Sequence, residues 1–289
     1  MRNKYVFSSG TVAEASSLQY QHRLFLREMG TLIPERFPLN EIETVLDAKS
    51  GPGGWAIDLA KAYPAMQVTG MDVDIDMVRM ATEDARTAKV TNVTFDVGNI
   101  CKALPYTSAY FDFVRILMGS ELASPQMWPG IIRELLRVIR PGGWLNLIEY
   151  EPGPMSSPAL DVISPLLSKA LVKVEWAVSP DGIAATSGVL LPRLLTEAGC
   201  TGVGYTLYPV NLGGWDNLAG RTYVMTALAY GNRVTLFLLK AEMITQPDMN
   251  TLLQKIEQDV EQLDFCGVGM LISTFARKPT TQEAHTGEE

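Results

Sequence analysis

A glycine-rich turn is the first feature of the sequence whose residues could do chemistry. Residues 43–47 (ETVLD) form an apolar run that ends in Asp47, and Gly51, Gly53 and Gly54 follow shortly after it. Glycine permits positive φ angles and lets backbone N–H groups come close to a ligand, and the start of a helix favours a carboxylate or a phosphate. The turn therefore predicts a ligand-binding site where a strand passes into a helix.

A carboxylate at the end of the next predicted strand completes the pattern. Gln67–Asp72 (QVTGMD) reads as that strand, and Asp72 is its last residue. In a parallel sheet, ligands bind at the carboxyl ends of the strands, where the strand order reverses. The Asp72 carboxylate could accept hydrogen bonds from both hydroxyl groups of a ribose. The turn and Asp72 together predict a nucleoside site, and a turn that merely joins strand to helix is the simpler alternative.

Dinucleotide binding is a competing interpretation of the same turn. Its fingerprint is G-x-G-x-x-G, and the matching window would run from Lys49 to Gly54. The first glycine is absent because Lys49 stands there, and Pro52 follows Gly51. These departures disfavour a pyrophosphate site, so an NAD(P)-dependent oxidoreductase is the weakest of the enzymatic interpretations.

The elements that must hold this turn alternate regularly along the first half of the chain. Apolar residues recur at helical spacing over 11–30, Asp74 is a suitable N-cap, and Pro125 suits the first turn of a helix. Strands that alternate with helices predict a parallel sheet covered on both faces. The predicted strands are 43–47, Gln67–Asp72, 92–96, Phe111–Leu117 and 144–149, and the predicted helices are 55–63, 75–88 and one from near Pro125 to the Pro-Gly-Gly at 141–143.

The pattern changes after Tyr150, where helices become more frequent. We expect these helical additions to form walls of a pocket. The predicted elements are a loop at 151–158 (EPGPMSSP), helices at 159–177 and 191–198, strands at 203–208 and 265–277, and two helices between about 221 and 263.

Four ordered segments resemble the motifs of a known family, the class I S-adenosylmethionine (SAM)-dependent methyltransferases. The resemblance covers about residues 43–149, and four motifs in order are far more specific than one. The segments are 45–55 (VLDAKSGPGGW), 68–72 (VTGMD), 96–100 (DVGNI) with the strand after it, and 136–145 (LRVIRPGGWL).

The resemblance implies a fold and a division of the chain. The fold would be a doubly wound α/β structure with a mostly parallel seven-stranded sheet, an antiparallel last strand paired with the sixth, helices on both faces and extra helices as a cap. Residues 1–40 would form an N-terminal helical segment, 41–150 the SAM-binding core and 151–289 the rest of the sheet. Insertions at about 156–180 and 211–263 would form the acceptor pocket.

The resemblance also implies SAM as the cofactor, with Asp72 in the ribose-binding position. Lys49 replaces the usual first glycine, and Asn99 replaces an aspartate that usually accepts from the adenine amino group. Asn99 can still accept through its side-chain oxygen, and Lys49 could pair with the methionine carboxylate or point into solvent. The cofactor-binding residues expected from the resemblance are Asp47, Lys49, Gly51, Gly53, Asp72, Val73, Asn99, Ile100 and Arg115.

Methyl transfer from a sulfonium is an in-line displacement that depends above all on positioning. A base is needed only if the acceptor is a hydroxyl or a carbon acid. His22 is a candidate base, although it could simply cap or pack the N-terminal helix, and Glu149 could orient the acceptor or face water. We expect no metal, and an acceptor that is small, largely apolar and methylated on O, N or C. Aromatic residues that could line its pocket are Tyr5, Tyr20, Trp128, Tyr150, Trp176 and Trp215.

The two departures from the family pattern keep other interpretations open. A fold does not fix a function, so Lys49 and Asn99 could belong to a SAM-fold enzyme that catalyses a cyclisation or an elimination instead of methyl transfer. A non-catalytic SAM-binding protein is the remaining alternative.

The composition limits the partners. The 289 residues include 24 Lys and Arg against 32 Asp and Glu, a net charge of −8, so the clustered positive charge that nucleic-acid binding requires is not expected. No apolar run approaches the roughly 18 residues of a membrane span. Three isolated cysteines suggest neither a disulfide framework nor a zinc site. We therefore expect a cytoplasmic monomer or homodimer whose partner is a small-molecule acceptor.

Overall fold

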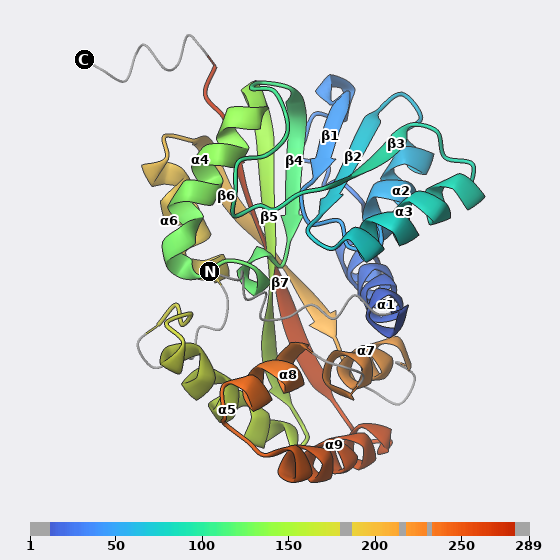
Figure 1. Cartoon of the computed structure of the whole chain (residues 1–289), viewed down its shortest axis with the longest axis vertical. Coiled ribbons are helices and arrows are strands. Elements are labelled where there is room, and N and C mark those ends of the chain that lie inside the picture. Colours follow the sequence, from blue (N-terminus) through green and yellow to red (C-terminus); the bar gives the residue numbers. More distant parts are fainter. Residues whose placement is uncertain (1–11, 180–186, 214–217, 230–232, 281–289) are drawn as a thin grey trace.

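The computed structural model of the chain describes residues 12–179, 187–213, 218–229 and 233–280. A sheet flanked by helices forms the upper part of the molecule in Figure 1, and a second group of helices lies below it. The longest strands of the sheet run from the upper part into the lower one, so a single sheet connects the two parts (Figure 1).

Within the described residues, seven strands form this sheet. The strands are β1 (Thr44–Asp47), β2 (Gln67–Asp72), β3 (Val93–Val97), β4 (Phe111–Leu117), β5 (Ile139–Met155), β6 (Thr201–Asn211) and β7 (Gly267–Arg277). Their spatial order is β3-β2-β1-β4-β5-β7-β6. The pairs among β1 to β5 are parallel, and β7 is antiparallel to both β5 and β6. The predicted fold class is confirmed.

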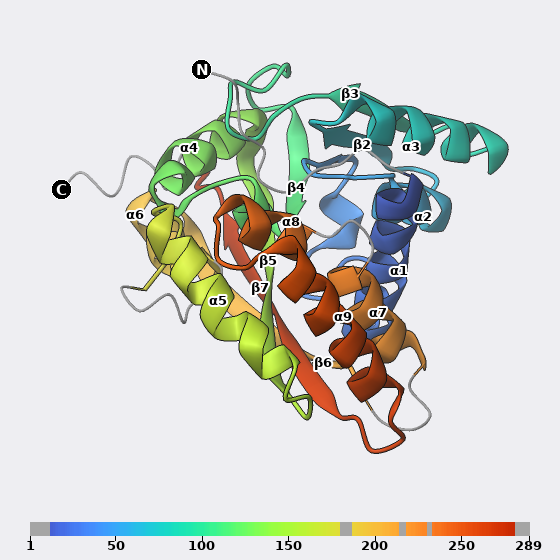
Figure 2. The same ribbon diagram turned by 60° about the horizontal axis from the view of Figure 1, so that its bottom comes forward.

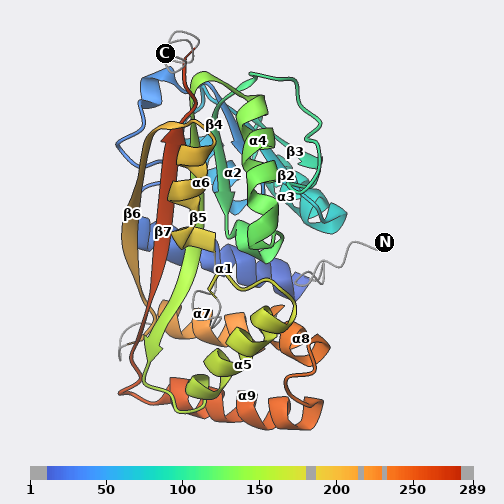
Figure 3. The same ribbon diagram turned by 90° about the vertical axis from the view of Figure 1, so that its left-hand side faces the viewer.

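Helices cover both faces of the sheet, because neighbouring strand residues point to opposite sides. On one side Val45 and Phe113 pack in the apolar cluster of α2 (Gly54–Ala62), and α3 (Ile75–Thr87) lies beside it. On the other side Leu46 and Val114 pack in the cluster that includes α4 (Trp128–Val138) and α6 (Leu191–Glu197) (Figure 3). The order reverses between β1 and β4, which places the switch point of the sheet at the carboxyl end of β1.

Local signals in the sequence account for several helix ends. The Asp74 side chain accepts a hydrogen bond from the backbone N–H of Asp76, which confirms the predicted N-cap of α3. Pro125 opens a 3-10 turn directly before α4, so it stands close to the predicted helix start. The short 3-10 helices are η1 (Leu39–Glu41), η2 (Gly119–Glu121), η3 (Pro125–Met127) and η4 (Ser187–Val189).

Strand β5 is much longer than predicted, and two expected breaks lie inside it. The Pro-Gly-Gly at 141–143 does not end a helix, and the first part of the predicted loop 151–158 continues the strand to Met155. Both proline-containing stretches coincide with register shifts, one between β4 and β5 and one between Pro152 and Met155 against β7. A β-bulge accommodates residues that cannot donate to the ladder. The prediction was wrong because the pairing partner, β7, is more than a hundred residues away in the chain.

The lower part of the molecule contains α5 (Leu160–Lys173), α7 (Leu218–Ala229), α8 (Arg233–Lys240) and α9 (Gln246–Glu261). Figure 2 shows α5, α7 and α9 lying across the ends of the long strands. The prediction of two helices between 221 and 263 was wrong, since three occupy this stretch. Thr245 caps α9 by accepting from the Asp248 backbone N–H, so a new helix begins where an apolar pattern alone showed none.

Helix α1 (Val12–Met29) crosses the molecule between the upper and lower parts (Figure 3). It contacts α2, α7 and β6, and its Leu24 and Phe25 are buried in the core shared with the lower helices. The predicted N-terminal helix is confirmed. Among the described helices, none combines the length and the apolar character that crossing a membrane would require.

Candidate functional site

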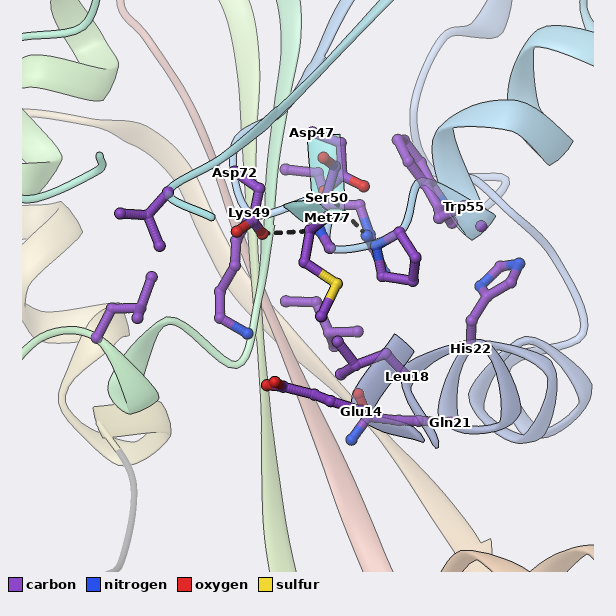
Figure 4. Close-up of a pocket in the computed structure, with 17 residues that line it drawn as sticks. Glu14, Leu18, Gln21, His22, Asp47, Lys49, Ser50, Trp55, Asp72 and Met77 are labelled. Atoms are coloured by element: carbon purple, nitrogen blue, oxygen red, sulfur yellow. Dashed lines mark hydrogen bonds and ion pairs between the residues drawn. The ribbon is translucent and has the colours of Figure 1, made fainter. Parts of the chain in front are cut away.

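A cleft opens between the carboxyl ends of β1, β2 and β4 and helix α1 (Figure 4). The space between its walls is about 740 Å³ with the open mouth included. The turn after β1 forms its floor. Glu14, Leu18, Gln21 and His22 of α1 face that turn from the opposite side.

The Asp72 carboxylate points into this cleft beside Gly51. Its Oδ2 accepts from the Gly51 backbone N–H at 2.8 Å, and its Oδ1 accepts from the Asp74 backbone N–H at 3.0 Å. A carboxylate oxygen has two acceptor positions, so each oxygen keeps one for a ligand hydroxyl. Val73 follows it and also lines the cleft.

The glycines of the turn have different functions. Gly51 lines the cleft with a φ of +52°, whereas Gly53, with a φ of +81°, is not among the lining residues. A Cβ at Gly53 would lie 2.8 Å from Ala81 Cβ and from the Phe95 ring, so this glycine allows the turn to approach α3 and β3. A Cβ at Gly54 would lie 2.9 Å from the His22 ring. Gly54 therefore makes room for α1.

Asp47 and Arg115 form a buried ion pair in the wall of the cleft. Arg115 Nη1 lies 3.2 Å from Asp47 Oδ1, and the side chains are 6% and 2% exposed, respectively. The Arg115 guanidinium also lies 4.4 Å from the centre of the Trp55 ring. Burial raises the pKa of Asp47, although the charge of Arg115 acts in the opposite direction. The pair holds two strand ends together and leaves little free charge.

Lys49 pairs with a residue that the sequence did not indicate. Its Nζ lies 2.7 Å from Glu121 Oε2 on η2, and the two side chains are only 11% and 19% exposed. Of the two predicted alternatives, pointing into solvent is therefore wrong. The long separation between Lys49 and Glu121 in the chain explains why spacing gave no signal.

Glu149 lies buried beside that ion pair and does not line the cleft. Its Oε1 accepts from the Ser120 backbone N–H at 3.0 Å, and its Oε2 has no hydrogen-bond partner among the described residues. Burial raises the pKa of Glu149 to about 8, and repulsion from Glu121 acts in the same direction. The predicted alternative that Glu149 faces water is wrong.

His22 hydrogen-bonds Asp58 of α2, with 2.9 Å between Nε2 and Oδ2. The ring lines the cleft, so His22 does not only pack its own helix. Asp58 was not predicted, because nothing in the spacing of residues 22 and 58 suggests contact. The Glu14, Leu18, Gln21 and His22 positions do share one face of a helix, and this spacing could have identified the face of α1 that meets the cleft.

Two residues expected at the adenine end lie outside the described lining of the cleft. Asn99 Oδ1 accepts from the Cys101 backbone N–H at 2.8 Å, and Ile100 is 2% exposed in the core. Of the predicted aromatic residues, Trp128 and Tyr150 are buried in the core, and Tyr20 and Trp176 do not line the cleft either. Tyr5 and Trp215 lie outside the described residues.

Another polar group in the floor was not predicted. Ser50 Oγ is buried, belongs to a lining residue and has no hydrogen-bond partner among the described residues. A buried hydroxyl without a partner is costly, and this oxygen is enclosed, since a Cβ at Gly70 of β2 would lie only 3.0 Å from it. Among all the residues that the structure describes, no group of His, Cys, Asp and Glu side chains has the arrangement of a metal site.

Comparison with known proteins finds a family match for about a third of the chain. Residues 45–143 match the methyltransferase domain family. The demethylmenaquinone methyltransferase of Lactococcus lactis is 29% identical over 137 residues, which are 45% of this chain and 53% of that protein. The chain spans about half the length of the curated relatives that it matches.

Solved structures extend the likeness to the fold of the whole chain. Phosphoethanolamine N-methyltransferase 2 of Haemonchus contortus matches with a TM-score of 0.56 at 15% identity, over 96% of this chain and 60% of that one. The [4+2]-cyclase SpnF matches with a TM-score of 0.50 at 21% identity, over 94% and 86%. At these identities only the fold is shared. Residues 45–143 thus match a methyltransferase domain, and the sheet order that continues beyond it completes a doubly wound α/β fold.

Proposed function

We propose that the protein binds SAM in the cleft and transfers its methyl group to a small, largely apolar molecule. The observation that carries the proposal is the Asp72 carboxylate, which faces the cleft beside Gly51 and keeps one acceptor position on each oxygen. This arrangement suits the two hydroxyl groups of a ribose.

The other residues of the floor fit the rest of the nucleoside and its amino-acid part. The charges of Lys49 and Arg115 are balanced by Glu121 and Asp47, so Asp72 gives this region a negative charge that favours a cation. A sulfonium is such a cation. Asn99 and Ile100 keep their proposed places at the adenine end, although a change in the 98–102 segment would be needed for contact.

When bound, SAM supplies a methyl group on a good leaving group. The chain then has to hold the acceptor atom in line with that methyl carbon and exclude water. Leu18, Met77, Leu117 and Leu122 give the cleft an apolar side that suits this task. The acceptor atom, O, N or C, is left open.

The division of the chain follows from the same proposal. Residues 1–40 would cover the cleft, 41–150 would bind SAM, and 151–289 would complete the sheet and carry the cap. The described helices α5, α7, α8 and α9 pack in a core that they share with α1 and with the long strands β5, β6 and β7. That the insertions at 156–180 and 211–263 form the acceptor pocket stays a prediction.

A non-methylating reaction is the second candidate, and one observation favours it. Both residues that depart from the family pattern are engaged within the protein, Lys49 with Glu121 and Asn99 with the Cys101 backbone. SAM would then be retained while the pocket catalyses a cyclisation or an elimination. SAM labelled in its methyl group distinguishes the two, because only methyl transfer moves the label to the product. A non-catalytic SAM-binding protein would yield neither product.

Calorimetric titration with SAM and with S-adenosylhomocysteine tests the proposed cofactor. We expect both to bind to the unmodified chain and Asp72→Asn to weaken binding about 10–100-fold, which corresponds to the loss of charge-assisted hydrogen bonds. Asp76→Asn is the matched control, since the Asp76 side chain is 56% exposed on the first turn of α3. Absence of binding to the unmodified chain, or equal binding by Asp72→Asn, would contradict the proposal.

A further inference from the structure

We propose that His22, held in place by Asp58, acts as the general base that removes the proton from an aromatic hydroxyl group of the acceptor. The inference rests on the proposed function, because the resulting phenolate oxygen would attack the methyl carbon of SAM. It assigns Asp58 a positioning role and narrows the acceptor to a phenol.

The hydrogen bond between the two side chains fixes which nitrogen of the His22 imidazole donates. Asp58 Oδ2 lies 2.9 Å from His22 Nε2, and a carboxylate can only accept. The hydrogen bond to His22 holds the pKa of Asp58 below its ordinary value, so the carboxylate is ionised. Nε2 therefore carries a hydrogen, and Nδ1 is the ring nitrogen through which His22 would act as a base.

The ring stands where two cavities meet. His22 lines both the SAM cleft and a smaller cavity of about 260 Å³, open mouth included, and the two cavities also share Trp55, Arg115 and Leu117. The His22 side chain is 13% exposed, and its ring lies against Gly54, where any Cβ would be only 2.9 Å away. The imidazole is thus held between the cofactor site and a second compartment.

That second compartment is apolar and partly aromatic. Phe25, Leu26 and Met29 of α1 and Leu32 form its walls together with Trp55. Leu and Met side chains adapt readily to a flat ring, and Phe25 and Trp55 favour aromatic contacts. An aromatic ring that enters here would bring its hydroxyl to the polar boundary, which His22 forms.

Among hydroxyl compounds, a phenol has the acidity that best suits a histidine base. Proton transfer is efficient when the acid and the base have similar pKa values. The phenol of tyrosine loses its proton near pH 10, about three to four units above a free imidazolium, and the Asp58 carboxylate stabilises the imidazolium that forms. An aliphatic alcohol is too weak an acid for this base, and a carboxylic acid would arrive already ionised.

The proposed step balances without another reactant. The hydroxyl proton passes to His22 Nδ1, an oxygen electron pair forms the new bond to the methyl carbon, and the carbon–sulfur bond breaks with its electrons remaining on sulfur. When the product leaves, the imidazolium returns the proton on Nδ1 to the solvent that enters the open cleft. His22 and Asp58 are regenerated in their starting state.

Other charged groups near His22 and Asp58 have effects that partly cancel. Lys61 lies 3.9 Å from Asp58 Oδ1, and Arg23 adds a weaker attraction to that carboxylate. Asp47 interacts with His22, but its charge is balanced by Arg115. Asp58 is therefore the carboxylate that hydrogen-bonds the His22 ring. It is also the negative charge that would stabilise the ring once His22 is protonated.

The test uses the full-length chain, saturating S-adenosylhomocysteine and 4-nitrophenol, whose visible absorption separates phenol from phenolate. The titration is performed at a pH where the free probe is mostly protonated. We expect the unmodified chain to convert the bound probe to phenolate and His22→Gln to lower the bound phenolate-to-phenol ratio about tenfold or more. Asp58→Asn should lower it about tenfold. Lys61→Gln, which changes an exposed neighbour of Asp58, should leave it unchanged within about twofold.

Three outcomes overturn the inference: failure of the probe to bind, binding to the unmodified chain as phenol, or equal ionisation in His22→Gln. Circular dichroism melting identifies a variant that has not folded, and Asp58→Asn then gives an independent measurement. S-adenosylhomocysteine binding is followed in the same samples. Loss of the phenolate signal with that binding intact contradicts only this inference, whereas absence of nucleoside binding contradicts the proposed function itself.

Discussion

Replacing Glu149 by Gln should remove a pH dependence from the folding stability of the protein. The Glu149 side chain is buried, and burial together with repulsion from Glu121 raises its pKa from about 4.5 to about 8. Between these values the folded protein retains a proton that the unfolded chain has released. Raising the pH through this window therefore removes stability from the unmodified protein, and the loss is complete above the folded pKa.

The size of the effect follows from the width of the window. Each pH unit between the two pKa values corresponds to about 1.4 kcal/mol. From about pH 6 to about pH 9 the unmodified chain should therefore lose about 3 kcal/mol through this one group, with little further change above pH 8. Gln has nearly the same shape and cannot ionise, so Glu149→Gln should lack this loss.

Urea unfolding at several pH values between about 6 and 9 measures the effect. The difference in unfolding free energy between Glu149→Gln and the unmodified protein should grow with pH. Glu257→Gln is the matched control, because it removes the same charge from an exposed position of α9. A constant difference across the range would refute the reasoning, as would equal pH dependence in Glu149→Gln and the control.

Further predictions concern packing and buried charge, and urea unfolding checks each. Arg115→Met should cost about 3–5 kcal/mol, because it leaves Asp47 buried without its cation; Arg79→Met, which removes an exposed pair, should cost less than about 1 kcal/mol. Gly53→Ala should destabilise by about 2 kcal/mol or more, since its φ is +81° and the new Cβ would overlap its neighbours. Gly130→Ala in α4, where nothing lies within 4 Å, should be neutral or stabilise by up to about 1 kcal/mol. Equal effects within either pair would contradict the argument.

The sheet core could be predicted because its signals are local. Gln67–Asp72 and Phe111–Leu117 are short apolar runs bounded by turn residues, and both strands have the predicted bounds. The Asp74 cap and the direction of Asp72 follow from residues only a few positions apart. The long β5 could not be predicted in the same way, since its prolines and glycines favour turns unless a distant strand supplies the pairing.

The site was only partly predictable for the same reason. The floor of the cleft comes from one turn, so Asp47, Gly51 and Asp72 could be identified from spacing alone. Glu121 and Asp58 were missed, because each meets its partner through the fold and not through a motif. Whether Lys49 would point outward or inward depended on Glu121, which no pattern around Lys49 reveals.

The ladder between β5 and β7 has a mechanical consequence for entry into the cleft. The two strands are paired from Trp144 and Arg277 to Met155 and Gly267, with one register shift after Pro152, so a sheet and not a flexible loop joins the lower helices to the upper part. Helix α1 is held by side chains instead, through packing against α2, α7 and β6 and through the hydrogen bond between His22 and Asp58. Entry into the cleft would therefore depend more on these side-chain contacts of α1 than on a movement of the lower helices.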